Sequence, residues 1–425
     1  MIEKRVIPLE MLRVACEQTL ELVEFSVPNT EVVSLRYFLA SMLNYLDDAI
    51  QKADDGWPII GHHFAFPAEV LYYFDCVPIA VEGASYLFSA LWPDGAEPYY
   101  DALESYGHPF HTCSAQKGAM GLNLEGLFKY DVVVTPSGPC DNSIASYPIF
   151  QNLQKDQKVK FFDMPVYSDK RTEEYLAKEL SSFKDDLGKM IGQKPDEEKF
   201  RKAVETEGKG IQLVKEINDL KKAIPCPFES LTVPIISGAT VCFNAHPEKN
   251  IFLENLLEYG KQNYRNKIKP NGEEKLRTIW PNMTLFFDVG YAEELDRKRG
   301  LSILFDIFNY IFYDPIDLSQ DINGVLEQLA HHARNKPMVR QAAGLADQMI
   351  EDMIYLAKEY QIDAAIFTNH VACKSLQPVI QLLREALREE LGIPFLSVDV
   401  DVGDKRFASS QTIRTEVDNF LETLY

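Results

Sequence analysis

Short apolar runs bounded by turn residues recur along this chain, and the stretches between them have the spacing of amphipathic helices. A run that is apolar at nearly every position indicates a strand buried on both faces, and strands that alternate with helices form parallel sheets. The runs fall into two groups, at 58–64, 77–83, 131–138 and 159–165, and at 276–282, 363–370 and 394–402. We therefore predict an α/β fold with two Rossmann-like parallel-sheet lobes.

The segments outside these runs have helical character. Residues 8–25 put apolar side chains at spacings of 3, 4, 4 and 3 on one helix face, namely Leu9, Leu12, Cys16, Leu20 and Val23. Charged helical segments dominate from about residue 172 to residue 231 and indicate a solvated bridge between the lobes. The predicted domains are an N-terminal helical cap, a first lobe, a helical bridge and a second lobe, at 1–55, 56–171, 172–274 and 275–425.

The charge balance limits the partners that this chain can have. Its 425 residues include 43 Lys and Arg against 64 Asp and Glu, so the formal net charge is −21. Such acidity repels phosphate backbones and anionic lipid, so we expect neither nucleic-acid nor membrane partners. No apolar run approaches the roughly 18 residues of a spanning helix, and no apolar block near the N-terminus precedes a cleavage site. We expect a cytoplasmic protein.

Several well-known motifs are missing from the sequence. It contains no G-x-G-x-x-G after a strand, no G-x-x-x-x-G-K-[ST] and no G-x-S-x-G, which argues against nicotinamide binding, a phosphate-loop ATPase and an esterase. It also contains no C-x-x-C, which argues against zinc ribbons and thioredoxin-like pairs. The adjacent His331 and His332 have no second metal-type residue four positions on, and they fit an ordinary helix surface.

The seven cysteines are the most informative polar residues. An odd number of dispersed cysteines in a cytoplasmic chain argues against structural disulfides. Cys140 and Cys373 each follow a predicted strand, and residues 130–143 and 362–375 echo each other in the order Asp, apolar strand, Thr, loop, Cys. Cys113 stands just before a predicted helix. Strand ends and helix starts collect ligands and favour thiolates, so these positions suit the ligands of a metal cluster.

The other four cysteines differ in their surroundings. Cys76, between a helix and a strand, fits a ligand or a packed thiol equally well. Cys226 lies between two prolines, where a helix is excluded, and this favours a ligand. Cys242, between Val241 and Phe243, suits core packing when it is considered alone. Cys16 is explained by the apolar face of the N-terminal helix.

The sequence resembles the family of 2-hydroxyacyl-CoA dehydratases and benzoyl-CoA reductase subunits. The likeness covers almost the whole chain. Its landmarks are the segment 66–83, Cys113, the Cys140–Asp141 pair after its strand, Cys373 after its strand, and the C-terminal segment 392–425. The resemblance implies two Rossmann-like lobes with an iron–sulfur cluster in the cleft, and Cys113, Cys140 and Cys373 would match the three ligands of the simpler dehydratase subunits.

Further cysteines at 76, 226 and 242 depart from that pattern and resemble the double-cubane cluster branch of the family. In that branch two [4Fe–4S] cubanes share a sulfide, and each takes three cysteines. The resemblance then implies an [8Fe–9S] cluster whose six ligands, once Cys16 is set aside, are Cys76, Cys113, Cys140, Cys226, Cys242 and Cys373. It also implies a homodimer and a separate ATP-hydrolysing iron–sulfur activator that supplies low-potential electrons.

The main functional hypothesis is therefore a double-cubane reductase that reduces small molecules with electrons from the activator. His370, His62 and His63 could supply protons near the cluster, because histidine titrates near neutrality; packing is an equal alternative for all three. A second hypothesis is a 2-hydroxyacyl-CoA dehydratase component with a single [4Fe–4S] cluster. A third is a non-catalytic electron carrier or cluster-delivery scaffold.

Overall fold

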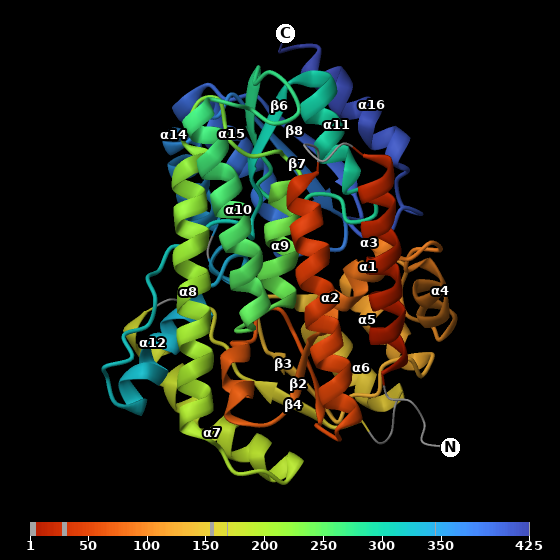
Figure 1. Ribbon diagram of the computed structural model, residues 1–425, viewed down its shortest axis with the longest axis vertical. Helices are drawn as coiled ribbons and strands as arrows, with labels where there is room; N and C mark the ends of the chain where they lie inside the picture. The colour runs from red at the N-terminus through yellow and green to blue at the C-terminus, as the bar shows by residue number, and fades with distance from the viewer. Residues whose placement is uncertain (1–5, 28–31, 154–156, 168, 345, 425) are drawn as a thin grey trace.

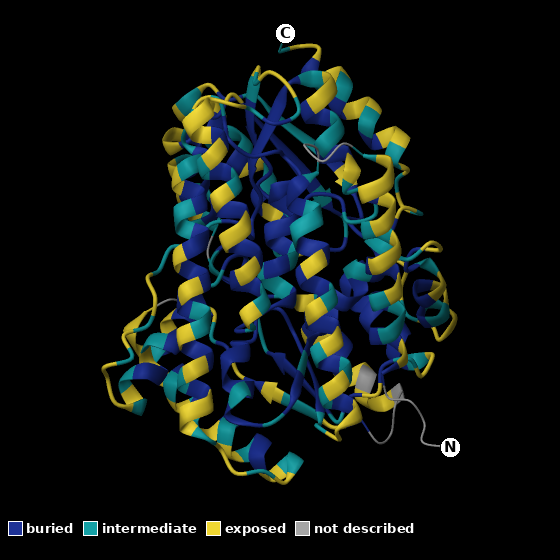
Figure 2. Ribbon diagram, in the orientation of Figure 1, coloured by how far each residue is buried: buried dark blue, intermediate teal, exposed yellow. Residues whose placement is uncertain are grey.

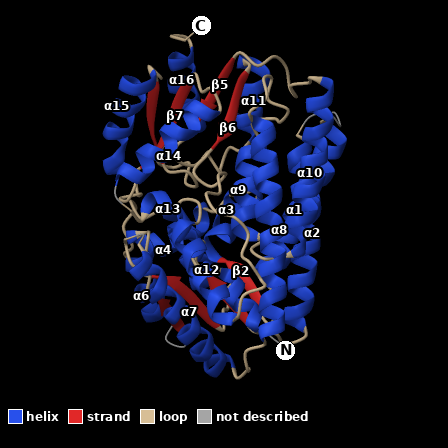
Figure 3. Cartoon of the chain, turned by 90° about the vertical axis from the view of Figure 1, so that its left-hand side faces the viewer, coloured by secondary structure: helices blue, strands red, loops and turns tan. Residues whose placement is uncertain are grey.

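A computed structural model of the chain describes residues 6–27, 32–153, 157–167, 169–344 and 346–424. Its strands form two separate sheets of four parallel strands, which lie at opposite ends of the molecule (Figures 1 and 3). The first sheet has the order β2-β1-β3-β4 and contains β1 (Ile59–His62), β2 (Val77–Ala80), β3 (Val132–Pro136) and β4 (Val159–Phe162). The second has the order β6-β5-β7-β8 and contains β5 (Leu276–Ile279), β6 (Leu301–Phe305), β7 (Ala364–His370) and β8 (Phe395–Val400).

These two sheets confirm the prediction of an α/β fold with two Rossmann-like lobes. Each predicted run contains one of the strands. The remaining strand, β6, lies in none of the predicted runs. That strand follows a charged helix directly after Gly300 and begins a mostly apolar stretch that continues to residue 312 without Gly or Pro, so neither residue marks where the strand ends. The limits of the four predicted domains remain a prediction.

Helices cover the sheets and join the lobes. Those of the first lobe are a short 3₁₀ helix η1 (Ala68–Tyr73), α3 (Val81–Leu91), α4 (Glu97–Ser105), α5 (Ser114–Leu124) and α6 (Asp141–Leu153). α7 (Lys170–Ile191) packs on the first lobe, against β4 and η1. Those that run beside both lobes are α1 (Ile7–Ser26), α2 (Val33–Asp54), α8 (Glu197–Lys221), α9 (Thr232–Cys242) and α10 (Pro247–Asn266) (Figure 1). Those of the second half are α11 (Gly290–Arg299), α12 (Ile322–Asn335), α13 (Val339–Ala342), α14 (Ala346–Glu359), η2 (Gln377–Val379), α15 (Ile380–Leu391) and α16 (Ser410–Leu421).

Local signals explain where the long helices begin and end. Asp169 accepts a hydrogen bond from the Thr172 N–H at 2.8 Å at the start of α7, and Gly192 ends that helix in the left-handed region at φ +73°. Asp196 caps α8 in the same way. The inner strands of both sheets and the inward helix faces are buried, whereas the outward helix faces are exposed (Figure 2). None of the helices in the described ranges has both the length and the apolar character that a membrane crossing requires.

The two sheets have the same topology. In each lobe the chain forms the inner strand, then its outer neighbour, and returns on the other side to form the third strand. An aspartate at the start of that third strand ties it to the first: the Asp131 carboxylate accepts from the Ile59 N–H at 2.7 Å, and the Asp363 carboxylate accepts from the Arg277 N–H at 2.8 Å. The sequence echo between 130–143 and 362–375 thus corresponds to equivalent strands, β3 and β7.

A buried ion pair connects the two lobes. Lys117 on α5 is buried, and its Nζ donates to Asp404 of the second lobe at 3.0 Å and to Glu104 on α4 at 2.8 Å. Arg406 completes the group through Glu104 at 2.7 Å and Asp404 at 2.6 Å. The Gly403 carbonyl accepts from the Ser89 hydroxyl at 2.7 Å. Helices of the first lobe are therefore fixed to the loop after β8.

We expect Lys117→Met to lower the stability of the protein by about 2 kcal/mol, because the buried Asp404 carboxylate loses one of its two cationic partners and keeps Arg406 alone. The measurement is the midpoint of thermal or denaturant unfolding. Lys170→Met is the matched control, since Lys170 and Glu174 form an exposed pair at 3.9 Å that contributes little. An unfolding midpoint for Lys117→Met equal to that of the control would contradict the role of this ion pair.

Candidate functional site

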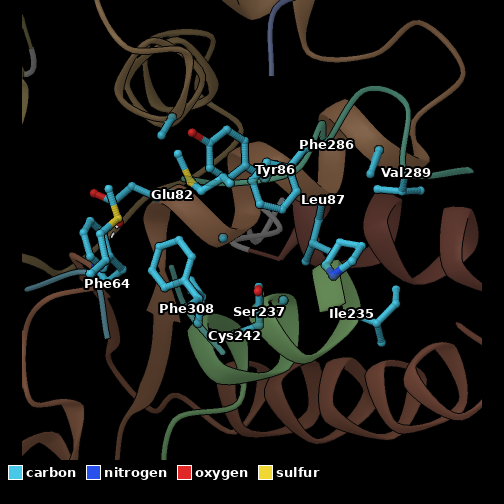
Figure 4. Close-up of a pocket in the computed structure, with 18 of the residues that line it drawn as sticks. Phe64, Glu82, Tyr86, Leu87, Ile235, Ser237, Cys242, Phe286, Val289 and Phe308 are labelled. Atoms are coloured by element: carbon cyan, nitrogen blue, oxygen red, sulfur yellow. Dashed lines mark hydrogen bonds between the residues drawn. The ribbon is translucent and has the colours of Figure 1, made fainter. Parts of the chain in front are cut away.

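A cavity of about 110 Å³ lies where the two lobes meet (Figure 4). Its walls come from α2, α3, α5 and α6, from α9, and from loops that follow β5, β6 and β7. Apolar side chains make up most of the lining. Tyr86 on α3 stacks on Phe286 of the second lobe with ring centroids 4.2 Å apart, so one wall is an aromatic bridge between the lobes.

Cys113, Cys140 and Cys373 all line this cavity. Cys113 is the N-cap residue of α5, Cys140 directly precedes α6, and Cys373 follows β7. Cys140 and Cys373 occupy equivalent places in the two lobes, because each follows the third strand of its sheet. Parallel strands present their carboxyl ends at one edge, and here the two edges face the same cavity. The structure therefore brings these three predicted residues together.

Asn142 links the three cysteine-bearing segments. Its Nδ2 donates to the Ala372 carbonyl at 2.6 Å, and its Oδ1 accepts from the Cys113 N–H at 3.5 Å. The Ser375 hydroxyl adds a second contact across the lobes, to the Pro139 carbonyl at 3.0 Å. These hydrogen bonds fix the start of α5, the start of α6 and the loop after β7 relative to one another.

Burial keeps the three thiols protonated. Desolvation raises the pKa of Cys373 to about 12, and it raises the pKa of Cys140 and, by a wide margin, that of Cys113. Backbone N–H groups oppose this effect, from Asn142 and Ser143 at Cys140 and from neighbouring residues at the other two. A bound cation would displace the thiol protons, since metal ions bind the thiolate. The N–H donors are already in place for thiolate sulfur.

His370, at the end of β7, contacts one of these thiols. Its Nε2 lies 3.2 Å from Cys113 Sγ, and its Nδ1 lies 3.4 Å from the Val402 N–H and 3.8 Å from an Asp401 carboxylate oxygen. Because Nδ1 accepts a hydrogen bond from the Val402 N–H, the ring proton is on Nε2, and this N–H donates a hydrogen bond to the sulfur. Of the three predicted histidines, His370 is the one that lines the cavity.

His63 lies behind the residues that line the cavity. Its Nδ1 accepts from the Ala65 N–H at 3.1 Å, so its Nε2 donates to the Ser143 hydroxyl at 2.6 Å. Burial lowers the pKa of His63 well below its usual value, and the ring is neutral. His62 is buried too, with Nδ1 3.1 Å from the His63 carbonyl and a pKa that burial lowers to about 4, and it does not line the cavity.

One buried carboxylate, Glu82, lines the cavity, and a second, Asp306, lies behind the lining residue Ser237; the sequence analysis missed both. Burial raises the pKa of Glu82 to about 7, although the Tyr147 hydroxyl donates to this carboxylate at 2.7 Å and the Phe64 N–H at 3.1 Å. Burial also raises the pKa of Asp306 to about 7, although the Ser237 hydroxyl contacts it at 2.8 Å. Both groups can hold or release a proton near neutral pH. Glu82 is a carboxylate inside an apolar run, which was the available signal.

The other predicted cysteine ligands are dispersed. Cys242 lines the cavity on the α9 side, against Gly83. Cys76 lies at a separate cavity, and its Sγ donates to the Leu71 carbonyl at 3.3 Å. Cys226 is buried beside Glu274, whose carboxylate accepts from the Cys226 N–H at 3.1 Å near the amino end of β5. The carboxyl ends of the strands are at the opposite edge.

The structure gives no compact site for a single ion. Across the described ranges, no group of three or more His, Cys, Asp and Glu side chains could hold one metal ion. A cluster differs from a single ion, because each cysteine of a cubane binds a different iron and the sulfurs stand farther apart. Cys113, Cys140 and Cys373 are the side chains that could hold such a group.

Comparison with known proteins identifies the family. The sequence model described as "2-hydroxyglutaryl-CoA dehydratase, D-component" matches residues 63–424, which include every described strand except β1 and all three cavity cysteines. The chain belongs to this family. It is also 19% identical, over 389 residues, to the (R)-2-hydroxyisocaproyl-CoA dehydratase alpha subunit of Clostridioides difficile, and the match covers 89% of this chain and 92% of that protein. The predicted membership in the 2-hydroxyacyl-CoA dehydratase family is confirmed.

The pKa of Asp306 predicts how stability changes with pH. Between its ordinary pKa of 3.8 and about 7, the folded state holds a proton that the unfolded state has lost, so stability falls as the pH rises. We expect Asp306 to contribute a loss of roughly 3 kcal/mol from pH 5 to pH 8, so Asp306→Asn should reduce the loss seen in the parent by that amount and leave the contribution of Glu82. Thermal unfolding of parent and variant across this range measures it. Parallel pH curves for the two proteins would contradict the raised pKa.

Proposed function

We propose that this protein is the cluster-bearing subunit of a 2-hydroxyacyl-CoA dehydratase, an enzyme that removes water from a 2-hydroxyacyl thioester. The single observation that carries the proposal is the convergence of Cys113, Cys140 and Cys373 on one apolar cavity between the lobes. Membership in the dehydratase family supports it. The cavity offers the reacting end of a substrate three thiols and one carboxylate, within a largely apolar enclosure.

The cofactor that fits these residues is one [4Fe–4S] cluster, with Cys113, Cys140 and Cys373 as ligands. Three sulfur donors face the cavity from three helix or loop starts, and N–H groups point at the sulfurs, as thiolate ligands require. Such a cluster, when bound, transfers single electrons at low potential. With three protein ligands, one iron of such a cluster would have no cysteine from this chain.

The chain's own residues then have distinct roles. The apolar lining excludes water, which protects reduced species and strengthens electrostatic interactions inside the site. His370 donates a hydrogen bond to Cys113 Sγ and lowers the electron density on that sulfur. Glu82, whose pKa burial raises to about 7, can hold or release a proton at the cavity wall. His63 is neutral and orients Ser143, so we assign it a positioning role.

The double-cubane reductase remains a second candidate because Cys242 lines the same cavity as the other three cysteines. Two cubanes need six thiolates, and Cys76 and Cys226 would have to supply the last two. Cys76 is bonded to Leu71 at another cavity, and Cys226 is at the amino end of the second sheet. The three-ligand site requires no such rearrangement, so we favour the dehydratase.

The partners follow from the chemistry. The chain has no nucleotide motif, and low-potential electrons require an energy source, so we propose a separate ATP-hydrolysing iron–sulfur activator. The Clostridioides difficile relative is named an alpha subunit, which supports a second subunit here, either a different chain or a second copy. Turnover of a 2-hydroxyacyl-CoA would exclude the third hypothesis, a non-catalytic electron carrier or scaffold.

The anaerobically purified chain should contain about four iron atoms, as one cubane requires. Cys113→Ala, Cys140→Ala and Cys373→Ala should each reduce the iron content and change the visible and electron-paramagnetic spectra, because all three bind the same cluster. Cys16→Ser is the control: Cys16 is buried on α1, away from the cavity lining, and should keep all its iron. About eight iron atoms, with losses in Cys76, Cys226 and Cys242 variants, would favour the double cubane instead.

Dehydration should depend on the activator and on ATP. The purified subunits, given a 2-hydroxyacyl-CoA and a chemical reductant, should turn over only after the activator and ATP are added, and the rate should fall at high salt because the acidic surface guides docking. The measurement is formation of the enoyl-CoA. ATP hydrolysis by the subunits alone, at a rate that matches turnover, would contradict this prediction.

A further inference from the structure

The cavity lining is neutral away from the cysteines. Among its described residues are one carboxylate, Glu82, and one histidine, His370, and no lysine or arginine. Five aromatic rings contribute to the walls, from Phe38, Phe64, Tyr86, Phe286 and Phe308. A charged group buried in such surroundings without a partner is strongly destabilised. The lining therefore discriminates against any ligand that carries a negative charge inside it.

The polar groups of the cavity lining lie at one end of the cavity. Figure 4 shows Glu82 and Phe64 on one side of the cavity and Ile235 and Val289 on the opposite side, with Leu87 between Tyr86 and Ile235. Glu82 belongs to the hydrogen-bonded group that contains Ser143, next to Cys140. The reacting carbons of a substrate belong at this end, and its remaining chain extends toward Ile235 and Val289.

Cations near the cavity are already engaged. Arg414 pairs with Asp288, the residue before Val289, at 2.8 Å, and it also pairs with Glu294. The buried Lys221 donates to the Leu304 carbonyl at 3.0 Å. The buried Lys336 donates to the Asn244 amide oxygen at 3.2 Å. None of the three lines the cavity, so a carboxylate at the far end of a substrate would find no positive partner there.

We infer that the acyl group taken by this site is uncharged, a branched aliphatic or aryl chain, and that dicarboxylic acyl groups such as glutaryl are rejected. The inference rests on the proposed function for the place of the substrate, and it adds the chemical class of the acyl chain. Aromatic walls suit either kind of apolar chain, because they gain contact area without needing a polar partner. The specificity-determining position is Val289, with Ile235 beside it.

Binding of two unreactive thioesters tests the inference without turnover. The probes are 4-methylpentanoyl-CoA and glutaryl-CoA, which lack the 2-hydroxyl group, and the measurement is anaerobic calorimetry on the purified holoprotein with any subunit that accompanies it. We expect 4-methylpentanoyl-CoA to bind at least about 100-fold more tightly. Equal binding, tighter binding of glutaryl-CoA or failure of both probes to bind would each overturn the inference.

A substitution at Val289 tests the assigned position. Val289→Arg places a cation at the far end and should reduce the preference for the uncharged probe by at least 10-fold. Val289→Leu is the matched control, since it adds volume without charge and should keep the preference for the uncharged probe. An unchanged preference in Val289→Arg, in a variant whose unfolding midpoint equals that of the parent, would overturn the assignment.

Turnover separates this inference from the proposed function. Tight binding of 4-methylpentanoyl-CoA without dehydration of its 2-hydroxy derivative, in the presence of activator and ATP, would refute the dehydratase and leave the acyl specificity standing. Dehydration of 2-hydroxyglutaryl-CoA in preference to the 2-hydroxy-4-methylpentanoyl thioester would refute the acyl specificity and support the dehydratase. Each measurement thus decides one statement.

Discussion

Two parallel sheets face each other with their carboxyl ends, and the rest of the structure depends on this arrangement. A parallel strand can deliver a side chain to the edge of its sheet only through the loop that follows it. Here the loops after β3 and β7 deliver Cys140 and Cys373, and α5 delivers Cys113 from the side. Asn142 holds the three segments in register through hydrogen bonds to Ala372 and Cys113.

Burial at this meeting point sets the chemistry of the site. Burial raises the pKa values of the thiols and Glu82 at the cavity and of Asp306 behind it, because desolvation disfavours their charged forms. N–H donors at the sulfurs and hydroxyl donors at the carboxylates partly compensate. The cavity therefore combines strong ligands for a cation, groups that can exchange protons near pH 7, and walls that keep water out.

Contacts remote from the cavity keep the lobes closed around it. Lys117 lies one helical turn after Cys113 and pairs with Asp404 of the other lobe, so the segment that carries a cavity cysteine is also a docking element. Tyr86 and Phe286 add an aromatic contact between the lobes. Because a buried ion pair tolerates little change in geometry, it favours one relative position of the lobes over others.

The sequence by itself determined the α/β class, the two lobes, most of the strands, and the family, because buried strands and strand-end cysteines leave patterns that act over a few residues. It could not reveal β6, because the mostly apolar stretch that contains this strand continues beyond it without Gly or Pro. Nor could it reveal Glu82 and Asp306, whose pKa values depend on burial by distant elements. Local surroundings ranked Cys226 as a ligand and Cys242 as core, whereas the fold lines the cavity with Cys242 and leaves Cys226 at the amino end of β5. Only the tertiary structure decided which cysteines meet, since that depends on how the two sheets are turned toward each other.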